Sequence, residues 1–571
     1  MDVVISAARE RLFGSGGAVD FSALFPALNR ALAASIVQRR WFGSKARTIR
    51  DVAATDWFPL TPDACLLLVR VDYAKGDAET YAIPLGLARS AAGEGPAGNV
   101  ATSDTPLIAR LVITPGDESA VLYDAMADAA VARRWLEMIA GGQEIAGRHG
   151  RLVGARQKRF DALRGTAAVP LEPRILQAEQ SNSSILFGDR LILKLFRRCE
   201  AGVNPDVEVT SYLTTRLGFS HVPPVAGTIE YQRPGEAAVS LAVMQGFVAN
   251  HGDAWRHTLG RLDDFFKRVA ALPGGGRSGA NFPDEAMVPD EPLLATAERA
   301  IPALATELIG PYLAEAELLG RRTAELHLAL ATETDEADFK PEPITPSDQR
   351  SFYDTSSRLI RETFMQLTER LVALTPAVRV SAERLLGLEG AIQNRFRAWI
   401  DRPVSGLRTR VHGDYHLGQV LWTGRDFMII DFEGEPARPM AERRLKQSPL
   451  RDVAGMLRSF DYATGAALES LAAADTGQDS TEAAERRAAR EAWARVWHVW
   501  SSAAFLRSYL ARTAGASFLP ERQHDLGWLL DEFLLEKAVY ELRYELNNRP
   551  DWVPIPLDAV LALAATPSGG D

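Results

Sequence analysis

One short segment of the chain contains the residue types that phosphoryl transfer needs. His412, Gly413 and Asp414 lie in a loop-like stretch, and Gln419 and Asp431 follow them. Phosphoryl transfer requires a group that orients the acceptor hydroxyl and accepts its proton, together with metal ions that bridge the phosphates. We predict that Asp414 is this base. His412 is a second candidate catalytic residue, but we expect a neutral histidine beneath the loop to brace the backbone rather than to move protons.

The residues after Asp414 predict a metal site. Residues 423–426 form the turn of a predicted β-hairpin, which would bring Gln419 and Asp431 together. An amide oxygen and a carboxylate are hard oxygen ligands of the kind that Mg²⁺ prefers. Because a histidine and an aspartate separated by one residue are common in ordinary surface loops, the prediction rests on the spacing of the whole segment.

A second group of residues, nearer the N-terminus, is suited to bind a nucleotide. Lys194 lies inside the apolar run 191–196, and Glu208 is on the helix predicted to follow. Kinases use a strand lysine to pair with the α- and β-phosphates, and a helix acid to position that lysine. A buried lysine without a partner is costly, but a lysine facing outward and a solvated glutamate would give the same pattern.

A small polar segment precedes this strand and could cover the phosphates with its amides and hydroxyls. Its members are Ser181, Asn182, Ser183 and Ser184. The segment is neither a Gly-x-Gly-x-x-Gly loop nor a P-loop, so alone it is a weak signal.

A third group lies near the C-terminus and is suited to bind a sugar. Lys537, Tyr540 and Tyr544 are three and four residues apart, which places them on one face of a helix. Polar aromatic rings on such a face could stack on a glucosyl unit. The alternative is a helix that packs two tyrosine rings against the rest of the protein. Tyr509, on a neighbouring predicted helix, is a weaker candidate.

An α+β fold is predicted for the elements that position these groups. Lys194 lies on a hairpin of residues 185–187 and 191–196. The next helix has Asn204 as its N-cap and Pro205 at its first position, and Gly218 is its predicted end. Beyond residue 255 the chain is mainly helical. Further helices and strands are predicted at 21–40, 65–73, 79–87, 107–114, 125–139, 228–232 and 237–244.

Three domains are predicted. They are an N-terminal α+β domain at 1–105, a β-rich nucleotide-binding lobe at 106–250, and a large helical C-terminal lobe at 251–571. The Gly-, Ala- and Ser-rich stretch 91–104 is expected to link the first two. The polar stretch 472–490 is expected to be a solvated loop or an exposed helix.

Composition excludes several classes of protein. The chain has 571 residues and a formal charge of −10, which disfavours nucleic acid as the main partner. It contains no uncharged apolar stretch of the length that spans a membrane, and it begins without the pattern of a signal peptide. The two cysteines, Cys65 and Cys199, are expected to be reduced core residues. We therefore expect a cytoplasmic protein.

Several long runs of the sequence resemble bacterial maltokinase. Those around the predicted catalytic loop are 412–421, 431–439 and 448–462. Others lie at 40–45, in the N-terminal cap of that family, and at 319–327, 537–545 and 548–550. The resemblance therefore covers nearly the whole chain. Within the cap motif, Trp41 and Phe42 are expected to form a packed corner.

The resemblance implies a two-lobed, kinase-like fold and a specific reaction. The family phosphorylates the anomeric hydroxyl of maltose with ATP and Mg²⁺, which gives maltose 1-phosphate for α-glucan and glycogen synthesis. Many members are fused to, or associate with, trehalose synthase. Carried over by motif, Met244, Gln245 and Phe247 would form the adenine-contacting hinge, and Glu433 and Arg438 would face the sugar.

Two other functions remain open at this point. A glucosamine kinase of the same superfamily would share the cap, the His-Gly-Asp loop and a carboxylate-rich sugar pocket. A catalytically silent regulatory partner of trehalose synthase is the other alternative. It is disfavoured because every position needed for phosphoryl transfer is filled.

Overall fold

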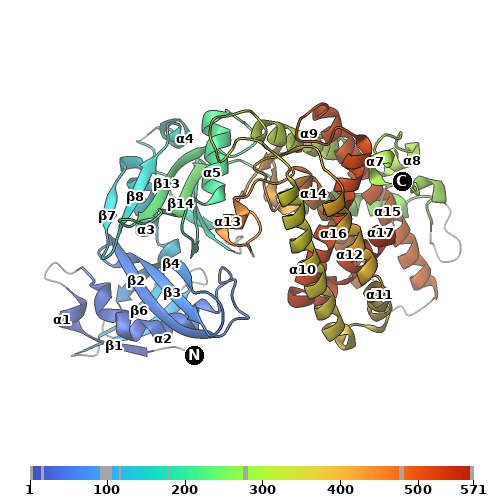
Figure 1. The fold of residues 1–571 in the computed structure, drawn as a ribbon. Helices are drawn as coiled ribbons and strands as arrows, with labels where there is room; N and C mark the ends of the chain where they lie inside the picture. Colours follow the sequence, from blue (N-terminus) through green and yellow to red (C-terminus); the bar gives the residue numbers. More distant parts are fainter. Residues whose placement is uncertain are drawn as a thin grey trace. The chain divides into compact units, whose positions relative to one another are not determined.

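The computed structural model (Figure 1) describes most of the chain. The residues it describes are 4–13, 18–89, 106–114, 118–166, 168–176, 181–273, 281–436, 438–474 and 481–565. The predicted linker at 91–104 lies outside these residues. The chain divides into two compact units, residues 1–249 and residues 250–571.

The first sheet of unit 1 is built mainly from the N-terminal residues. In spatial order its strands are β1 (Val4–Ala8), β5 (Leu107–Thr114), β6 (Glu118–Asp124), β4 (Glu79–Arg89), β3 (Ala64–Tyr73) and β2 (Ile49–Thr61), and β12 (Arg198–Cys199) also pairs with β4. Helix α2 (Phe25–Ile36) packs on this sheet because it buries Leu28 and Leu32 against the strands.

The second sheet of unit 1 carries the predicted nucleotide residues. Its strands, in spatial order, are β7 (Glu144–Ala146), β8 (Arg151–Arg156), β13 (Val225–Gln232), β14 (Val239–Gly246), β11 (Leu191–Leu195), β10 (Ser183–Phe187) and β9 (Pro173–Leu176). Helix α3 (Ala129–Gly141) lies between the two sheets (Figure 1), and its Trp135 belongs to a core that contains residues of both.

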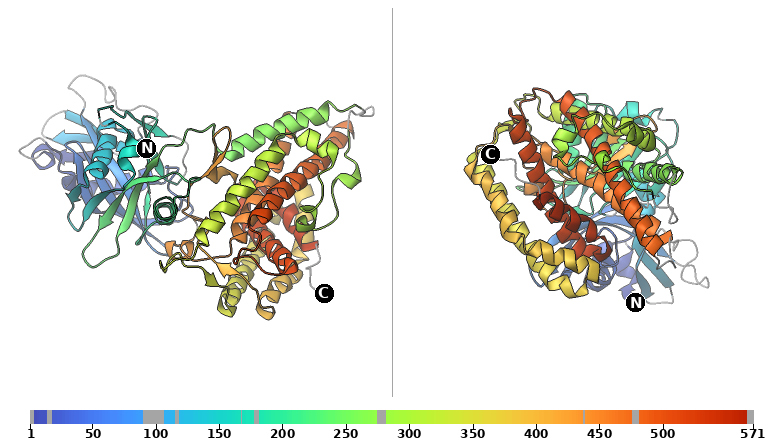
Figure 2. Two further views of the ribbon diagram at one scale, coloured as in Figure 1. Left: turned by 90° about the horizontal axis from the view of Figure 1, so that it is seen from above. Right: turned by 90° about the vertical axis from the view of Figure 1, so that its right-hand side faces the viewer.

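Unit 2 is mainly helical. Its helices of eight or more residues are α6 (Ala254–Ala270), α9 (Tyr312–Leu330), α10 (Pro346–Arg370), α11 (Pro376–Leu386), α12 (Glu389–Asp401), α14 (Leu450–Ala474), α15 (Thr481–Arg512), α16 (Gln523–Asn548) and α17 (Pro554–Ala565). The long helices pack side by side, as Figure 2 shows. One hairpin, β17 (Val420–Trp422) and β18 (Phe427–Ile429), follows the predicted catalytic loop.

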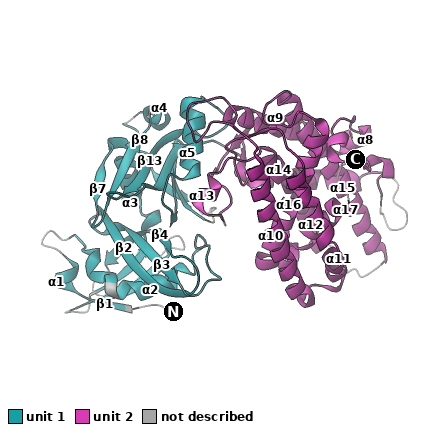
Figure 3. Cartoon of the chain, viewed as in Figure 1, with its two compact units in different colours: residues 1–249 teal, residues 250–571 magenta. Residues whose placement is uncertain are grey.

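The α+β class predicted from the sequence is confirmed, whereas the three domain limits stay predictions. Strands β5 and β6 come after the boundary placed near residue 105, yet they pair in the first sheet. The two compact units (Figure 3) meet in sequence at residues 249 and 250, next to the predicted limit of the nucleotide lobe. The polar stretch 472–490 contains the end of α14 and the start of α15, and its residues 475–480 lie outside the described parts.

Helices α9 and α15 approach each other closely at a glycine. A Cβ atom at Gly320, on α9, would lie 2.2 Å from the carbonyl oxygen of Phe505 on α15. We expect Gly320→Ala to destabilise the protein by about 1–3 kcal/mol, because the helices must separate to admit the methyl group. Chemical denaturation would measure the change. Gly260→Ala on α6 is the control, because a Cβ there meets nothing within 4 Å, and an equal loss in both variants would contradict the prediction.

Candidate active site

The loop that carries Asp414 is held by one buried carboxylate. Asp452, which is 2% exposed, accepts hydrogen bonds from the backbone N–H of His412 at 2.7 Å and of Gly413 at 2.9 Å. Burial would raise the pKa of Asp452, but its hydrogen bond with His327 and the charge of that residue hold the pKa below its ordinary value. The loop backbone is therefore fixed by an ionised group on α14.

His412 is placed to brace the loop, as the sequence predicts. It is 1% exposed, and its Nε2 lies 2.8 Å from the carbonyl oxygen of Ile430. A carbonyl oxygen can only accept, so the proton of the neutral ring is on Nε2. Its Nδ1 then accepts from the backbone N–H of Asp414 at 3.4 Å. Both ring nitrogens are occupied by backbone groups, which favours a supporting role.

Helix α9 supports the same loop and the hairpin after it. The guanidinium of Arg322 donates two hydrogen bonds of 2.8 Å to the carboxylate of Asp426, in the hairpin turn. One residue further along the helix, the hydroxyl of Thr323 lies 2.9 Å from that of Tyr415. These contacts give a physical reason for the run at 319–327 that the sequence singles out.

Tyr509 lies in the core rather than at a surface. It is 0% exposed, and its hydroxyl is 3.0 Å from Nδ1 of His327. The other ring nitrogen of His327 is 3.2 Å from Asp452. This buried position favours a role in supporting the loop over the sugar contact expected from the sequence.

Gln419 and Asp431 meet across the hairpin, as predicted. Nε2 of Gln419 donates to Oδ2 of Asp431 at 3.0 Å. Asp431 has φ of 66°, the only positive φ of a non-glycine residue in the described part of the chain. Left-handed backbone at such a residue costs about 1–3 kcal/mol and is typical of functional sites. The contact uses the amide nitrogen of Gln419, and a rotation of the amide would turn its oxygen toward the carboxylate, which gives two oxygen ligands of the kind that suit Mg²⁺.

Lys537 lies next to Asp414 and binds a carboxylate that the sequence analysis did not single out. Its Nζ donates to Oε1 of Glu435 at 2.8 Å and is 3.8 Å from Oδ1 of Asp414. Burial would lower the pKa of Lys537, but the charges of Glu435 and Asp414 raise it above its ordinary value. The ammonium group is therefore charged.

Glu435 is compensated by two cations. Besides Lys537, the Nε of Arg438 donates to its Oε2 at 2.7 Å. Burial would raise the pKa of Glu435, but Lys537 and Arg438 lower it to about 2. The neighbouring Glu433 accepts from Nη1 of Arg443 through its backbone carbonyl at 3.2 Å. The loop after the hairpin thus contains both residues that the resemblance assigns to the sugar.

Other acids near Lys537 on α16 are also paired. Glu536 accepts from Nη2 of Arg451 at 3.0 Å and 3.1 Å, and Glu541 accepts from Nε of Arg458 at 2.8 Å. Both arginines are on α14, in the run 448–462. These pairs were not predicted, because the sequence of one helix does not reveal which other helix packs against it.

The two predicted sugar-stacking tyrosines lie along α16 after Lys537. The ammonium of Lys537 is 4.7 Å from the centre of the Tyr540 ring. Tyr544, one turn further, is 45% exposed, and the guanidinium of Arg549 lies 5.6 Å from the centre of its ring. One helix therefore presents all three side chains in order, and the outermost ring is open to solvent.

The predicted nucleotide residues lie together in unit 1. The register of β10 and β11 places Ser184 opposite Lys194. Nζ of Lys194 is 3.1 Å from Oδ2 of Asp206, which is 1% exposed and lies on α5 (Pro205–Ser211). The sequence named Glu208, two residues later on that helix, as the partner, and this role of Glu208 stays a prediction. The ion pair with Asp206 was missed because Asp206 reads equally well as a residue that favours the start of a helix.

A side-chain contact lies in the segment before Lys194, and backbone pairing places the predicted hinge. Asn182 is 7% exposed and donates to the hydroxyl of Ser181 at 3.2 Å, just before β10. Met244 is fully buried on β14, and Gln245 lies opposite Ile192. The backbone N–H of Phe247 donates to the carbonyl of Arg190 at 2.8 Å.

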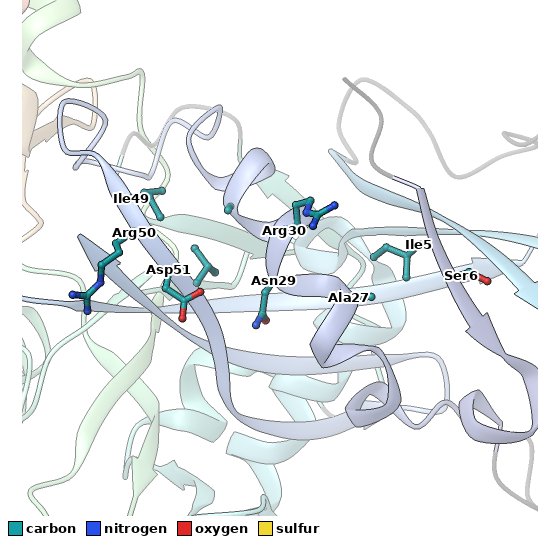
Figure 4. A pocket seen from close by; sticks show the side chains of 10 residues that line it. Ile5, Ser6, Ala27, Asn29, Arg30, Ile49, Arg50 and Asp51 are labelled. Carbon is teal, nitrogen blue, oxygen red and sulfur yellow. The ribbon is translucent and has the colours of Figure 1, made fainter. Parts of the chain in front are cut away.

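A pocket of about 630 Å³ is lined by residues of helix α2 and of strands β1 and β2 in the first sheet (Figure 4). It is lined by Ile5, Ser6, Ala27, Asn29, Arg30, Ala33, Ile49, Arg50, Asp51 and Val52. None of the residues predicted to bind a nucleotide, a metal or a sugar lines it. We assign it no part in phosphoryl transfer.

Comparison with known proteins finds similarity to sugar kinases. The glucosamine kinase of Streptacidiphilus jiangxiensis is 24% identical over 402 residues, which are 70% of this chain and 74% of that protein. The glucosamine kinase of Mycolicibacterium smegmatis (strain ATCC 700084 / mc(2)155) is 24% identical over 291 residues, 51% of this chain and 58% of its own. Residues 36–128 match the maltokinase N-terminal cap domain.

Solved structures of glucosamine kinase share the fold. One, in complex with glucosamine, ADP and inorganic phosphate, has a TM-score of 0.55 and 18% identity, and the match covers 94% of this chain and 98% of that one. Another, crystal form B, has a TM-score of 0.58 and 17% identity over 93% and 97% of the two chains.

The chain therefore has a kinase-like fold in common with these glucosamine kinases, and the comparisons support a sugar kinase of the same superfamily. The match of residues 36–128 to the maltokinase N-terminal cap domain agrees with the resemblance found in the sequence. In the part of the chain that the structure describes, no helix is long and apolar enough to span a bilayer.

Proposed function

We propose that this protein is a kinase that transfers the γ-phosphoryl group of ATP to the anomeric hydroxyl of maltose. The observation that carries the proposal is the charged network beside Asp414, in which Lys537 lies 2.8 Å from Glu435 and 3.8 Å from Asp414. The maltokinase cap at 36–128 supports the same assignment. The ADP bound to one solved relative supports the use of ATP.

The proposed chemistry assigns one proton transfer to Asp414. The acceptor hydroxyl donates a hydrogen bond to the carboxylate, its oxygen attacks the γ-phosphorus, and the bond to the β-phosphate oxygen breaks to release ADP. Asp414 takes the proton that the hydroxyl loses. Asp452 and His412 fix the loop backbone, so the carboxylate is held in place before the acceptor arrives.

Gln419 and Asp431 are proposed to hold Mg²⁺. When bound, the ion neutralises charge on the phosphates and orients them. Lys194 is proposed to pair with the α- and β-phosphates, with its ammonium positioned by Asp206 at 3.1 Å. The segment 181–184 is proposed to cover the phosphates.

A neutral acceptor suits this site better than an ammonium sugar. Glu435 is already neutralised by Lys537 and Arg438, and Glu536 is paired with Arg451. An amino sugar would bring a positive charge close to Lys537, and like charges at short range repel, most strongly where water is excluded. Maltose carries no charge and offers hydroxyls and ring faces, which Tyr540 and Tyr544 can contact.

Glucosamine is the second candidate acceptor. The relatives similar to this chain over much of its length are glucosamine kinases, which favours it. A role without catalysis, as a partner of trehalose synthase, and a place in α-glucan or glycogen synthesis remain predictions that follow from the resemblance to maltokinase.

A coupled kinase assay across maltose, glucosamine, glucose and an aminoglycoside would test the acceptor. We expect maltose to have the highest kcat/KM. We expect Tyr540→Ala and Tyr544→Ala each to lower kcat/KM for maltose by roughly 5- to 150-fold, about 1–3 kcal/mol, through lost apolar area and a lost polar contact.

Glucose has no second ring, so it should lose less in the same variants. The control is Val372→Ala, because this side chain is 86% exposed and belongs to none of the predicted sites. Preference of the wild type for glucosamine, or equal losses on maltose and glucose, would contradict the maltose proposal.

A further inference from the structure

Arg197 is a buried cation that touches two different parts of unit 1. It comes two residues after β11, and its side chain is 2% exposed. Its Nη2 lies 2.9 Å from Oδ2 and 3.2 Å from Oδ1 of Asp124, and its Nε donates to the hydroxyl of Ser183 at 2.8 Å. A buried arginine needs such partners, because an unpaired charge there is costly.

One side of Arg197 is held by the cap. Asp124 is the last residue of β6, is 4% exposed, and also accepts from the backbone N–H of Met126 at 3.1 Å. The guanidinium of Arg197 lies 5.1 Å from the centre of the Trp41 ring. Trp41 packs against Tyr81 with ring centres 5.7 Å apart. The packed corner expected from the cap motif therefore contacts Arg197 through the ring of Trp41.

The other side of Arg197 is the start of the strand that precedes Lys194. Ser183 is the first residue of β10 and pairs with Leu195, and Ser184 pairs with Lys194. The hydroxyl bound by Arg197 thus belongs to the segment 181–184, one residue from the position opposite Lys194. Arg197 thus connects that segment to the end of β6 through two contacts, one with Ser183 and one with Asp124.

We propose that Arg197 is a positioning residue through which the cap domain holds the segment 181–184 in place for nucleotide binding. The inference rests on the proposed function, in which the segment 181–184 covers the phosphates of the nucleotide. It adds that the cap domain affects the affinity for the nucleotide as well as the stability of the fold. The nitrogen that binds Asp124 and the nitrogen that binds Ser183 belong to one rigid planar group, so loss of the first contact loosens the second.

A purely structural role makes a different prediction. Buried ion pairs often contribute little net stability, and an apolar residue of similar volume can replace them without loss. In that case Arg197→Met would leave nucleotide affinity unchanged in protein that remains folded. If Arg197 positions the segment, the same variant binds nucleotide more weakly. The segment 181–184 is then not held in place beforehand, and part of the binding free energy is spent on ordering it.

The experiment measures nucleotide affinity and steady-state kinetics in three full-length variants. In Arg197→Met we expect the Kd for MgATP and the KM for ATP to rise by roughly 5- to 30-fold, the scale of one or two lost hydrogen bonds to a charged group. The KM for the sugar should change less than about 2-fold. Asp124→Asn should act in the same direction but less, because the amide keeps the size of the side chain and loses its charge.

Arg198→Met is the matched control, since this neighbouring side chain is 41% exposed and pairs with Glu79 and Glu200. Its Kd for MgATP should equal that of the wild type.

Unchanged affinity in both Arg197→Met and Asp124→Asn, with the thermal transition showing folded protein, would overturn the proposal. If Arg197→Met does not fold, the result for Asp124→Asn decides. Direct nucleotide binding needs no sugar, so this outcome is separate from failure of the maltose assignment.

Discussion

Replacement of Asp414 by Asn should lower kcat by about 10²–10⁴-fold, the usual contribution of a positioned general base. The amide keeps the size and hydrogen-bonding shape of the side chain but cannot accept the proton of the acceptor hydroxyl. The loop itself should stay in place, because its backbone is held by Asp452 and His412 rather than by the Asp414 side chain. Stopped assays of phosphorylated sugar would measure the loss.

Nucleotide binding separates this effect from misfolding. The Kd for MgATP should be close to that of the wild type, because Lys194 and its neighbours are unchanged. Asp263→Asn is a matched control, as this carboxylate is 59% exposed on α6 and pairs only with Lys267 among the described contacts. Wild-type turnover in Asp414→Asn would remove the residue from the role of base.

The sequence predicted local structure well where a few neighbouring residues determine it. Asn204 caps α5 by accepting from the backbone N–H of Asp206 at 2.8 Å, and Pro205 is the first helical residue, as expected. Gly218 has φ of 65°, which suits the predicted end of the helix. The short hairpin brought Gln419 to Asp431 for the same reason, because a tight turn fixes the pairing of its strands.

The pairing of charges across helices could not be predicted. Periodicity shows that Lys537 and Tyr540 share one face of α16, but it does not show that Glu435 faces them from the loop after the hairpin. Tyr509 has the same residue type as the sugar candidates, and only the packing of α15 on α9 places its hydroxyl on His327. Such contacts depend on the tertiary arrangement, which no local pattern of a single sequence specifies.

Replacement of Asp431 should abolish most activity even at saturating Mg²⁺. Asp431 supplies the only carboxylate of the predicted pair, and water can replace neither its charge nor its fixed position. Loss of several kcal/mol of charge stabilisation corresponds to a fall in kcat of about 10²–10³-fold. Asp431→Asn is a better test than Asp431→Ala, because Asn tolerates the left-handed φ of 66° whereas Ala adds backbone strain. We expect both variants to lose most of their activity and Asp431→Ala to be less stable.

Gln419→Ala provides the contrast that tests the metal assignment itself. Its amide is neutral and water can occupy its place, so this variant should keep some activity and require more Mg²⁺ to reach half of its maximal rate. The stabilisation of the thermal transition by ATP should depend on Mg²⁺ in the wild type and much less in Asp431→Asn. If Asp431→Asn showed the wild-type Mg²⁺ dependence in both the rate and the transition, the hairpin would hold Gln419 and Asp431 together for a structural reason alone, and the cation would have to be bound elsewhere.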